Sequence, residues 1–459
     1  MGQWKKVSIW TMIVAFLVVI AGCSSSNTNT ESTANEKASS KNMGTPSETN
    51  NPTPQGGGVK EGAIDLKGRT IKIATFWDIE PKGDTENSEK ELKRWRDVEA
   101  KYNVKLKVVN IPYEEFRDQF TASALAGKPI GDMAYLEMSW ITTAAQGGLL
   151  QNLNDYVNRD YWPKNMMDWA GYKGDLYGMS PSSVSGRGIY YNKTLFKNAG
   201  LEDPYDLVMK KEWTWDKFLE MAKQLTKDTD GDGKIDQYGY HGVWYMIGQD
   251  FINSNNAEVI GFKDGKYISG WDEPNAREAL RFIYDLIHVH KVVAPFPAEE
   301  RTDAFTSGKV AMKQTMGWEG TQIKTVLGDN FGFIPTPMGP KADKYYSPHG
   351  GPASVVIPKG VENPEVLVKI FEELTGPAED WDNSTRETLE GSQPSERDVD
   401  LILSLKNDVK MARETISQST NANFVEAMAD IFYEGVTAEV AVEKRKLAMQ
   451  NAIDEFFNK

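Results

Sequence analysis

The spacing of apolar residues changes its period several times after residue 66. Ile71 and Ile73 alternate with polar neighbours, as on one face of a β-strand. Leu92, Trp95 and Tyr102 instead recur at helical spacing. The pattern predicts a strand at 70–76, a helix at 88–102, a strand at 104–108, a helix around 116–120 and a strand at 132–136. Because strands and helices alternate, this part of the chain is expected to form βαβ units around a parallel sheet.

Two tryptophans follow the ends of predicted strands. Trp77 lies in the loop expected at 76–78 after the first strand, and Trp140 lies in the loop expected at 137–140 after the third. In open α/β sheets ligands bind beyond the carboxyl ends of the strands, and flat aromatic rings offer apolar surfaces to a ligand. We therefore expect Trp77 and Trp140 to be platforms for a ligand. Trp95, Trp213 and Trp215 lie on a helix face or at a helix start, where packing is the expected role.

The first 65 residues follow a different pattern. Lys5 and Lys6 precede an apolar stretch at 7–20, which is short for a membrane span but typical of a signal peptide. The stretch leads into Cys23, the only cysteine, in a context that resembles the bacterial lipobox. A plain signal peptide with an incidental cysteine is the alternative. We predict a lipoprotein signal peptide at 1–22, with lipidation of Cys23.

The segment that follows Cys23 is rich in Ser, Asn, Thr, Gly and Pro and has almost no large apolar residue. Such a composition cannot bury enough surface to offset the entropy of ordering. Residues 23–65 are therefore expected to be a disordered tether. The folded part would then stand on the extracytoplasmic face of the cell membrane, in the manner of a Gram-positive surface lipoprotein.

Length and charge narrow the range of functions. The chain has 459 residues and a formal net charge of −14. The length favours two lobes over a single core. Nucleic acid and anionic lipid surfaces attract basic proteins, so the acidic charge argues against both as partners. Contact with the membrane is expected through the lipid anchor alone.

A series of short motifs follows in order through the rest of the chain. The first two are 146–153 (QGGLLQNL) and 172–179 (YKGDLYGM). The others are at 190–193, 199–201, 213–218, 305–312, 331–335 and 435–439. Together they resemble the family 1 extracellular solute-binding proteins, which serve carbohydrate ABC importers.

This resemblance implies a particular α/β architecture. The expected fold is the two-lobed periplasmic-binding-protein-like fold, in which each lobe is a mostly parallel sheet flanked by helices and the ligand cleft lies between the lobes. Lobe one is expected at 66–180 plus 316–362, and lobe two at 188–312 plus 363–459. The small residues, Pro and Gly of 180–187 suit a hinge crossing that absorbs rotation as the lobes close.

The resemblance also implies a function. The chain is expected to be a monomeric binding protein, not an enzyme, that captures a carbohydrate, favoured to be an oligosaccharide, and delivers it to the permease subunits of an ABC transporter. A glycan-degrading enzyme is one alternative, and it would need two carboxylates about 5–9.5 Å apart. No motif marks such a pair. A binding protein for a non-sugar solute such as a peptide is the other.

Further ligand contacts are expected in the second half of the chain. The candidates are Trp244, Trp318, Glu319 and Phe424. Trp318 follows a predicted strand at 310–316, where the family commonly places ligand contacts, and is the favoured one. Arg187 and Lys313 bring positive charge to the cleft if they reach it, which would admit an acidic sugar. Surface salt bridges are the preferred reading of these two, with Arg187 kept as a candidate contact.

An acidic loop has the spacing of a calcium site. Oxygen ligands are predicted from the side chains of Asp228, Asp230, Asp232 and Asp236 and from the carbonyl of Lys234. Gly233 lies where a calcium loop turns sharply. The twelfth position is Gly239 instead of the usual bidentate Glu, so another donor or water would complete the shell. A structural calcium ion is favoured over an acidic turn without metal.

Overall fold

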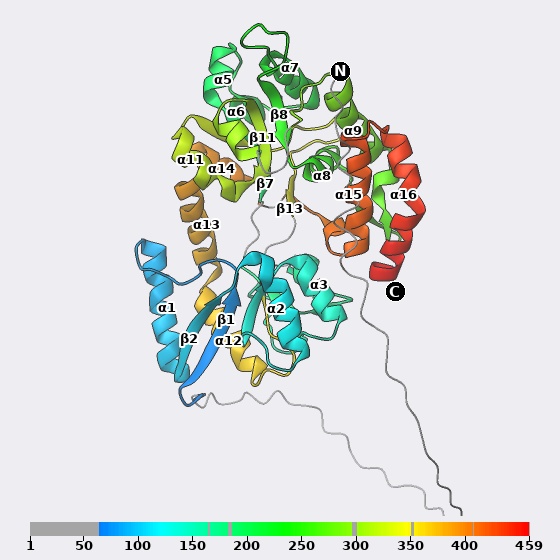
Figure 1. Cartoon of the computed structure of the whole chain (residues 1–459). Coiled ribbons are helices and arrows are strands. Elements are labelled where there is room, and N and C mark those ends of the chain that lie inside the picture. Colours follow the sequence, from blue (N-terminus) through cyan, green and yellow to red (C-terminus); the bar gives the residue numbers. More distant parts are fainter. Residues whose placement is uncertain are drawn as a thin grey trace, which may run out of the picture. The chain divides into compact units, whose positions relative to one another are not determined.

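Two β-sheets, each beside its own hydrophobic core, organise the folded part of the chain (Figure 1). The computed structural model describes residues 64–163, 166–181, 186–295, 301–349, 353–406 and 408–458. The predictions for the signal peptide, for Cys23 and for nearly all of the tether lie outside these residues.

The first sheet confirms the βαβ units that periodicity predicted. Its strands are β1 (Arg69–Thr75), β2 (Val104–Asn110), β3 (Met133–Leu136), β6 (Gly178–Met179) and β14 (Ser354–Val356), in the order β2-β1-β3-β14-β6. β1 pairs in parallel with β2 and β3, whereas β14 is antiparallel to both of its neighbours. The sheet is therefore parallel except for β14.

Helices cover both faces of this sheet. They are α1 (Glu86–Tyr102), α2 (Tyr113–Leu125), α3 (Met138–Gln146) and α12 (Pro364–Thr375). Ile71 and Ile73 of β1 belong to the cluster formed with α1 and α12, while the neighbouring Ala74 belongs to the cluster formed with α2 and α3. The alternation of side chains along β1 thus sends successive residues into opposite layers. Thr85 caps α1 by accepting a hydrogen bond from the backbone N–H of Ser88 at 3.2 Å.

The second sheet is also mostly parallel, but its strands follow a different order. Its strands are β7 (Arg187–Asn192), β8 (Tyr238–Gly242), β11 (Val310–Met316) and β12 (Phe331–Ile334), in the order β12-β7-β11-β8. β7 is antiparallel to β11 and β12, and β8 is parallel to β11. Three strands run in one direction and β7 runs in the other. The predicted fold class, two lobes with mostly parallel sheets flanked by helices, is confirmed.

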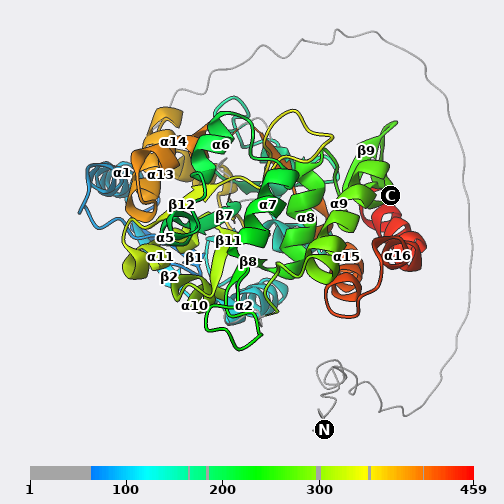
Figure 2. The same cartoon turned by 90° about the horizontal axis from the view of Figure 1, so that it is seen from above.

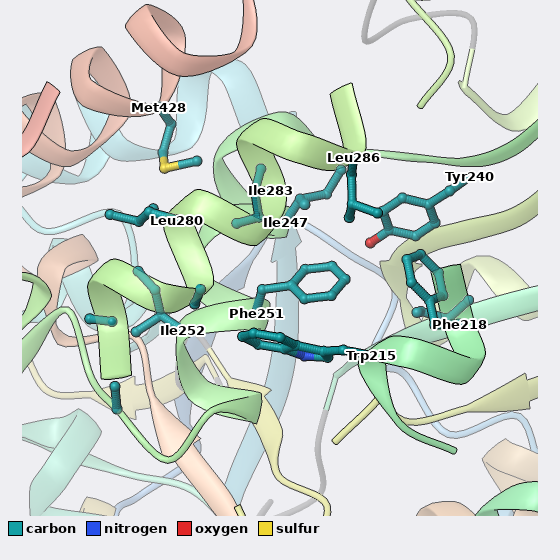
Figure 3. Packing of buried hydrophobic residues seen from close by; sticks show 14 of the residues in the cluster. Trp215, Phe218, Tyr240, Ile247, Phe251, Ile252, Leu280, Ile283, Leu286 and Met428 are labelled. Carbon is teal, nitrogen blue, oxygen red and sulfur yellow. The ribbon is translucent and has the colours of Figure 1, made fainter. Parts of the chain in front are cut away.

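Aromatic rings fill the core of the second lobe. Its main helices are α5 (Lys193–Asn198), α6 (Pro204–Met209), α7 (Trp215–Leu225), α8 (Trp244–Ser254), α9 (Pro274–Tyr284), α15 (Gln418–Phe432) and α16 (Ala438–Ile453). Figure 2 shows α7, α8 and α9 side by side, and in Figure 3 Phe251 lies among Trp215, Phe218 and Tyr240. The ring centroid of Phe251 is 5.9 Å from that of Trp215. Trp213 and Trp215 are buried, so their predicted packing role is confirmed.

The boundaries between the lobes differ from those expected. β12 lies within 316–362, which was assigned to lobe one, but it pairs with β7 in the second sheet. α12 lies within 363–459, which was assigned to lobe two, but its apolar face joins the core of the first sheet. The order of motifs along a chain shows which segments exist, and it does not show which sheet each segment joins.

The chain passes between the sheets more than once. β6 ends at Met179 in the first sheet and β7 begins at Arg187 in the second, so one crossing falls within 180–187, where the hinge was predicted. α13 (Ala378–Ser392) runs from one lobe to the other (Figure 1). Near its start Asp380 pairs with Arg94 of α1 at 2.8 Å. Near its end the carbonyl oxygen of Glu390 accepts a hydrogen bond from Lys324.

The other elements are smaller. They are α4 (Met167–Ala170), β4 (Gly171–Tyr172), β5 (Asp175–Leu176), β9 (Ile260–Lys263), β10 (Lys266–Ser269), η3 (Gly270–Asp272), η4 (Asp285–Val289), α10 (Arg301–Thr306), η6 (Gly317–Glu319), α11 (Gly320–Leu327), β13 (Ser347–His349), α14 (Glu396–Ser404), β15 (Val409–Met411), η7 (Arg413–Thr415) and η8 (Asp454–Asn458). Among the described helices, none combines the length and the apolar character that a membrane span requires.

Candidate functional site

Aromatic side chains gather where the parallel strands of the first sheet end. Phe76, the residue after β1, is their hub: its ring centroid lies 4.6 Å from that of Trp77, 5.2 Å from Tyr113 and 5.5 Å from Trp140. Tyr113 and Trp140 are also neighbours, with centroids 5.4 Å apart. We call Trp77, Tyr113 and Trp140 the aromatic edge. The two predicted platforms are thus brought together, and Tyr113 joins them.

The aromatic edge presents part of its rings to solvent. Trp77 is 38% exposed and Tyr113 is 47% exposed, while Trp140 is half-buried. Trp140 was expected in a loop, but it lies in the first turn of α3, which begins at Met138. Phe116 of α2 stacks on Trp140 with a centroid distance of 6.1 Å. The position of the Trp140 ring is therefore set by the backbone of α3 and by its packing against Phe116.

A carboxylate stands beside these rings. The hydroxyl of Tyr113 donates to Glu137, with both carboxylate oxygens at 3.3 Å. Burial raises the pKa of the Glu137 carboxyl above its ordinary value. Burial, Glu137 and, more weakly, Tyr245 of α8 raise the pKa of Tyr113 to about 12. The aromatic edge thus combines apolar ring faces with a hydrogen-bonding carboxylate, which is the chemistry that sugar hydroxyls and C–H faces require.

The second lobe also carries exposed aromatic rings. Trp244 starts α8 and is half-buried, with its ring centroid 5.4 Å from that of Tyr245 and 5.7 Å from that of Tyr433. Trp318, in η6 after β11, is 72% exposed. No ring contact among the described residues joins Trp318 to the aromatic edge. Trp244 and Trp318 therefore stay predicted ligand contacts.

Two predicted contacts lie inside the protein. Phe424 is 1% exposed and packs in the core of the second lobe near Trp271, so no face of its ring is open to a ligand. Glu319 is 7% exposed, and its carboxylate accepts hydrogen bonds from Lys313 and from Thr315. We correct Phe424 to a core residue and Glu319 to the partner of a buried lysine. Sequence spacing placed both near strand or helix ends but did not reveal their depth.

Arg187 belongs to a buried network instead of the ligand surface. It is 4% exposed, its Nε lies 3.4 Å from Oδ1 of Asp250, and it donates to the side chain of Gln249. Gln249 in turn donates to Glu414, in η7. Gln314 of β11 donates to Oδ2 of Asp250 at 2.7 Å. We call these five residues the buried network. The pairing of Arg187 and Lys313 with carboxylates corrects the preferred reading of surface salt bridges, because both pairs are internal.

The carboxyls of the buried network are expected to make stability depend on pH. Burial raises the pKa of Asp250 to about 6 and that of Glu414 to about 7, although Arg187 partly offsets both shifts. A group whose pKa is raised by folding stabilises the folded state fully below its unfolded pKa, here near 4, and loses that contribution as the pH rises through its folded pKa. The free energy of unfolding should therefore increase as the pH falls from 8 to 5, by about 1–3 kcal/mol from these groups.

Urea unfolding at pH 5, 6, 7 and 8 measures this dependence. The double variant Asp250→Asn, Glu414→Gln should show a flatter profile, because its amides do not titrate. The same slope in the wild-type chain and in the double variant would contradict the assignment.

The acidic loop brings three of its predicted metal ligands together. Carboxylate oxygens of Asp228, Asp230 and Asp236 lie within 4.8 Å of one another. Asp228 accepts hydrogen bonds from the backbone N–H groups of Gly231 at 2.7 Å and Gly233 at 2.8 Å, and both glycines have positive φ angles. Asp232, the fourth predicted side-chain ligand, does not belong to this cluster. Asp232 pairs with the ammonium of Lys234 at 2.7 Å, which takes its carboxylate out of the cluster as the loop stands.

The chain is similar to known bacterial binding proteins. The family model described as bacterial extracellular solute-binding protein matches residues 84–381. An arabinooligosaccharide-binding protein of Halalkalibacterium halodurans is 25% identical over 269 residues, which are 55% of each chain. Lipoprotein LipO of Bacillus subtilis is 24% identical over 327 residues, which are 65% of this chain and 62% of LipO. The chain spans less than two thirds of the length of the curated relatives it matches.

Solved structures share the fold. The GacH receptor of Streptomyces glaucescens, described both unliganded and in complex with acarbose, aligns with a TM-score of 0.64 at 18% identity. The alignment covers 85% of this chain and 99% of the receptor. At this level of identity the likeness concerns the fold, and it agrees with the two sheets described above.

Proposed function

Because the chain belongs to the bacterial extracellular solute-binding proteins, we propose that it binds an oligosaccharide and delivers it to the permease of an ABC importer. The observation that carries the sugar assignment is the aromatic edge. Trp77, Tyr113 and Trp140 gather at the carboxyl ends of parallel strands beside the Glu137 carboxylate. The names of relatives, such as the arabinooligosaccharide-binding protein of H. halodurans, support the same class of ligand.

Closure on the ligand would follow from the two-lobed fold. Trp244 and Trp318 belong to the second lobe and would meet the sugar from the side opposite to the aromatic edge. A ligand that contacts both lobes stabilises the closed form, because only that form makes both sets of contacts. In this proposal the chain has no catalytic role, and it acts as a monomer.

A lipid anchor at Cys23 would keep this receptor near its permease. The proposal rests on the lipobox-like context of Cys23, and the likeness to Lipoprotein LipO is consistent with it. Several acyl chains on one residue give stable membrane attachment, whereas one chain is marginal. Mass spectrometry of the mature amino-terminus should find a diacylglyceryl group on Cys23. A mature chain with an unmodified cysteine would refute the anchor.

Calorimetry with a panel of ligands tests the binding function. The full-length protein would be purified in a detergent without a sugar head group and titrated with arabino-, malto- and xylo-oligosaccharides, with their monosaccharides and with short peptides. Saturable binding of an oligosaccharide without cleavage products is the expected result. Binding of peptides alone would refute the sugar assignment, and release of shorter sugars would favour a glycan-degrading enzyme.

We also propose that the acidic loop holds a structural calcium ion. The clustered oxygens of Asp228, Asp230 and Asp236 fit a hard cation, although the twelfth position offers no carboxylate. Titration with calcium should therefore show a weak site, with a Kd of about 10⁻⁴–10⁻³ M. Asp230→Ala should abolish the heat of binding. Asp232→Asn is the matched control and should change it less, because Asp232 already pairs with Lys234. Absence of heat in the wild-type protein would refute the site.

A further inference from the structure

The charges around the aromatic edge indicate whether a neutral or an acidic ligand would bind there. We propose that the site selects neutral saccharides over those with uronic-acid carboxylates, and that Glu137 is the residue that determines this selection. The inference rests on the proposed sugar-binding function and deepens it. Three observations support it: the state of Glu137, the burial and pairing of Arg187 and Lys313, and the charges that flank the aromatic edge.

Glu137 is a partly buried carboxylate at the ligand surface. It follows β3 directly, and its oxygens accept from the hydroxyl of Tyr113, whose ring contacts Trp140. Within the described part of the chain, Glu137 has no ion-pair partner. Burial raises the pKa of its carboxyl, which means that the surroundings already disfavour its negative charge. A ligand carboxylate placed beside it would add repulsion in a site of reduced dielectric constant.

The two cations that were expected to attract an acidic sugar, Arg187 and Lys313, have carboxylate partners inside the protein. Arg187 is buried against Asp250 and Gln249. Lys313 is fully buried and donates to Glu319. An ammonium or guanidinium that already has a carboxylate partner inside the protein offers little to a second anion outside. The acidic-sugar hypothesis required these two residues at the ligand surface, and the structure buries both.

The cationic side chains that flank the aromatic edge add little positive charge there. Arg117, one turn along α2 from Tyr113, is exposed and lies 3.6 Å from Asp118. Lys82 is exposed and pairs with Asp78, the residue after Trp77, at 3.0 Å. Exposed pairs of this kind carry little net charge and are screened by salt. The Glu137 carboxylate is therefore a charge that a bound sugar would meet at the aromatic edge.

Matched pairs of ligands test the inference, since the members of a pair differ in charge alone or nearly so. The pairs are maltotetraose and its derivative with the terminal C6 hydroxyl oxidised to a carboxylate, arabinotetraose and its derivative oxidised at the terminal C5, and trigalacturonate as methyl ester and as free acid. Calorimetry at pH 8 and low salt should give the neutral member of a binding pair a Kd lower by about tenfold or more. Glu137→Gln should shrink this ratio to about threefold or less.

Glu114→Gln is the matched control, because Glu114 is an exposed acid next to Tyr113 and should leave the ratio unchanged. Thermal melting of each variant checks that it is folded. Equal or tighter binding of the acidic member, or the same ratio in Glu137→Gln as in the wild type, would overturn the inference while leaving sugar binding intact. Binding of neither member in any pair, together with binding of peptides, would overturn the proposed function and this inference together.

Discussion

Replacing Arg187 by methionine is expected to lower the free energy of unfolding by about 3–5 kcal/mol. Arg187 is the cation that faces Asp250, and it reaches Glu414 through Gln249. Its removal takes a compensating positive charge away from two buried carboxyls, and methionine restores the volume but not the charge. Urea unfolding at pH 8, where both carboxyls favour ionisation in solution, measures the loss.

Two further variants separate charge from packing. Arg117→Met removes an exposed arginine and should change stability by about 0.5 kcal/mol or less. Adding Asp250→Asn to Arg187→Met should recover part of the loss, because the uncompensated charge disappears with it. A loss below about 1 kcal/mol for Arg187→Met, or strictly additive effects in the double variant, would show that the ion pair contributes little.

The buried network shows why the sequence alone could not reveal which residues lie close together. Arg187 lies in β7, Asp250 in α8 and Glu414 in η7, so their proximity depends on three segments that are far apart along the chain. The residue types alone favoured a surface salt bridge for Arg187, with a ligand contact as the alternative. Burial depth depends on the same long-range packing, and for this reason Glu319 and Phe424 were mistaken for surface residues.

The first three strands of the first sheet could be predicted because their signals are local. Ile71 and Ile73 mark β1 by alternation, and the helical spacing of Trp95 and Tyr102 marks α1, each within one element. Assigning β12 and α12 to the correct sheet requires a knowledge of chain crossings, which periodicity does not contain.

The candidate site could also be predicted only in part. Trp77 and Trp140 follow strand ends, and the rule that ligands bind at the carboxyl edge of a parallel sheet brings them together. Tyr113 was missed, and Glu137 was not singled out within the loop expected at 137–140, because their hydrogen bond joins α2 to the end of β3. A carboxylate directly after a short buried strand, three residues before a tryptophan, was the available signal.

Replacing Trp140 by alanine is expected to weaken oligosaccharide binding by about 30-fold, or about 2 kcal/mol. Trp140 contacts Phe76, Tyr113 and Phe116, so its loss removes one platform and loosens the neighbouring Tyr113. A large aromatic anchor at the centre of a binding surface contributes more than peripheral contacts. Calorimetry with the oligosaccharide that binds the wild-type chain measures the change in Kd.

The control must lose a comparable ring away from the aromatic edge. Trp95 of α1 is a half-buried tryptophan of the same lobe, and it packs against the core on the other face of the first sheet. Trp95→Ala should lower the melting temperature as Trp140→Ala does, because both remove packed aromatic area. Only Trp140→Ala should weaken binding in the folded protein. Equal losses of affinity in the two variants would mean that Trp140 acts through stability, and unchanged affinity in Trp140→Ala would remove it from the ligand surface.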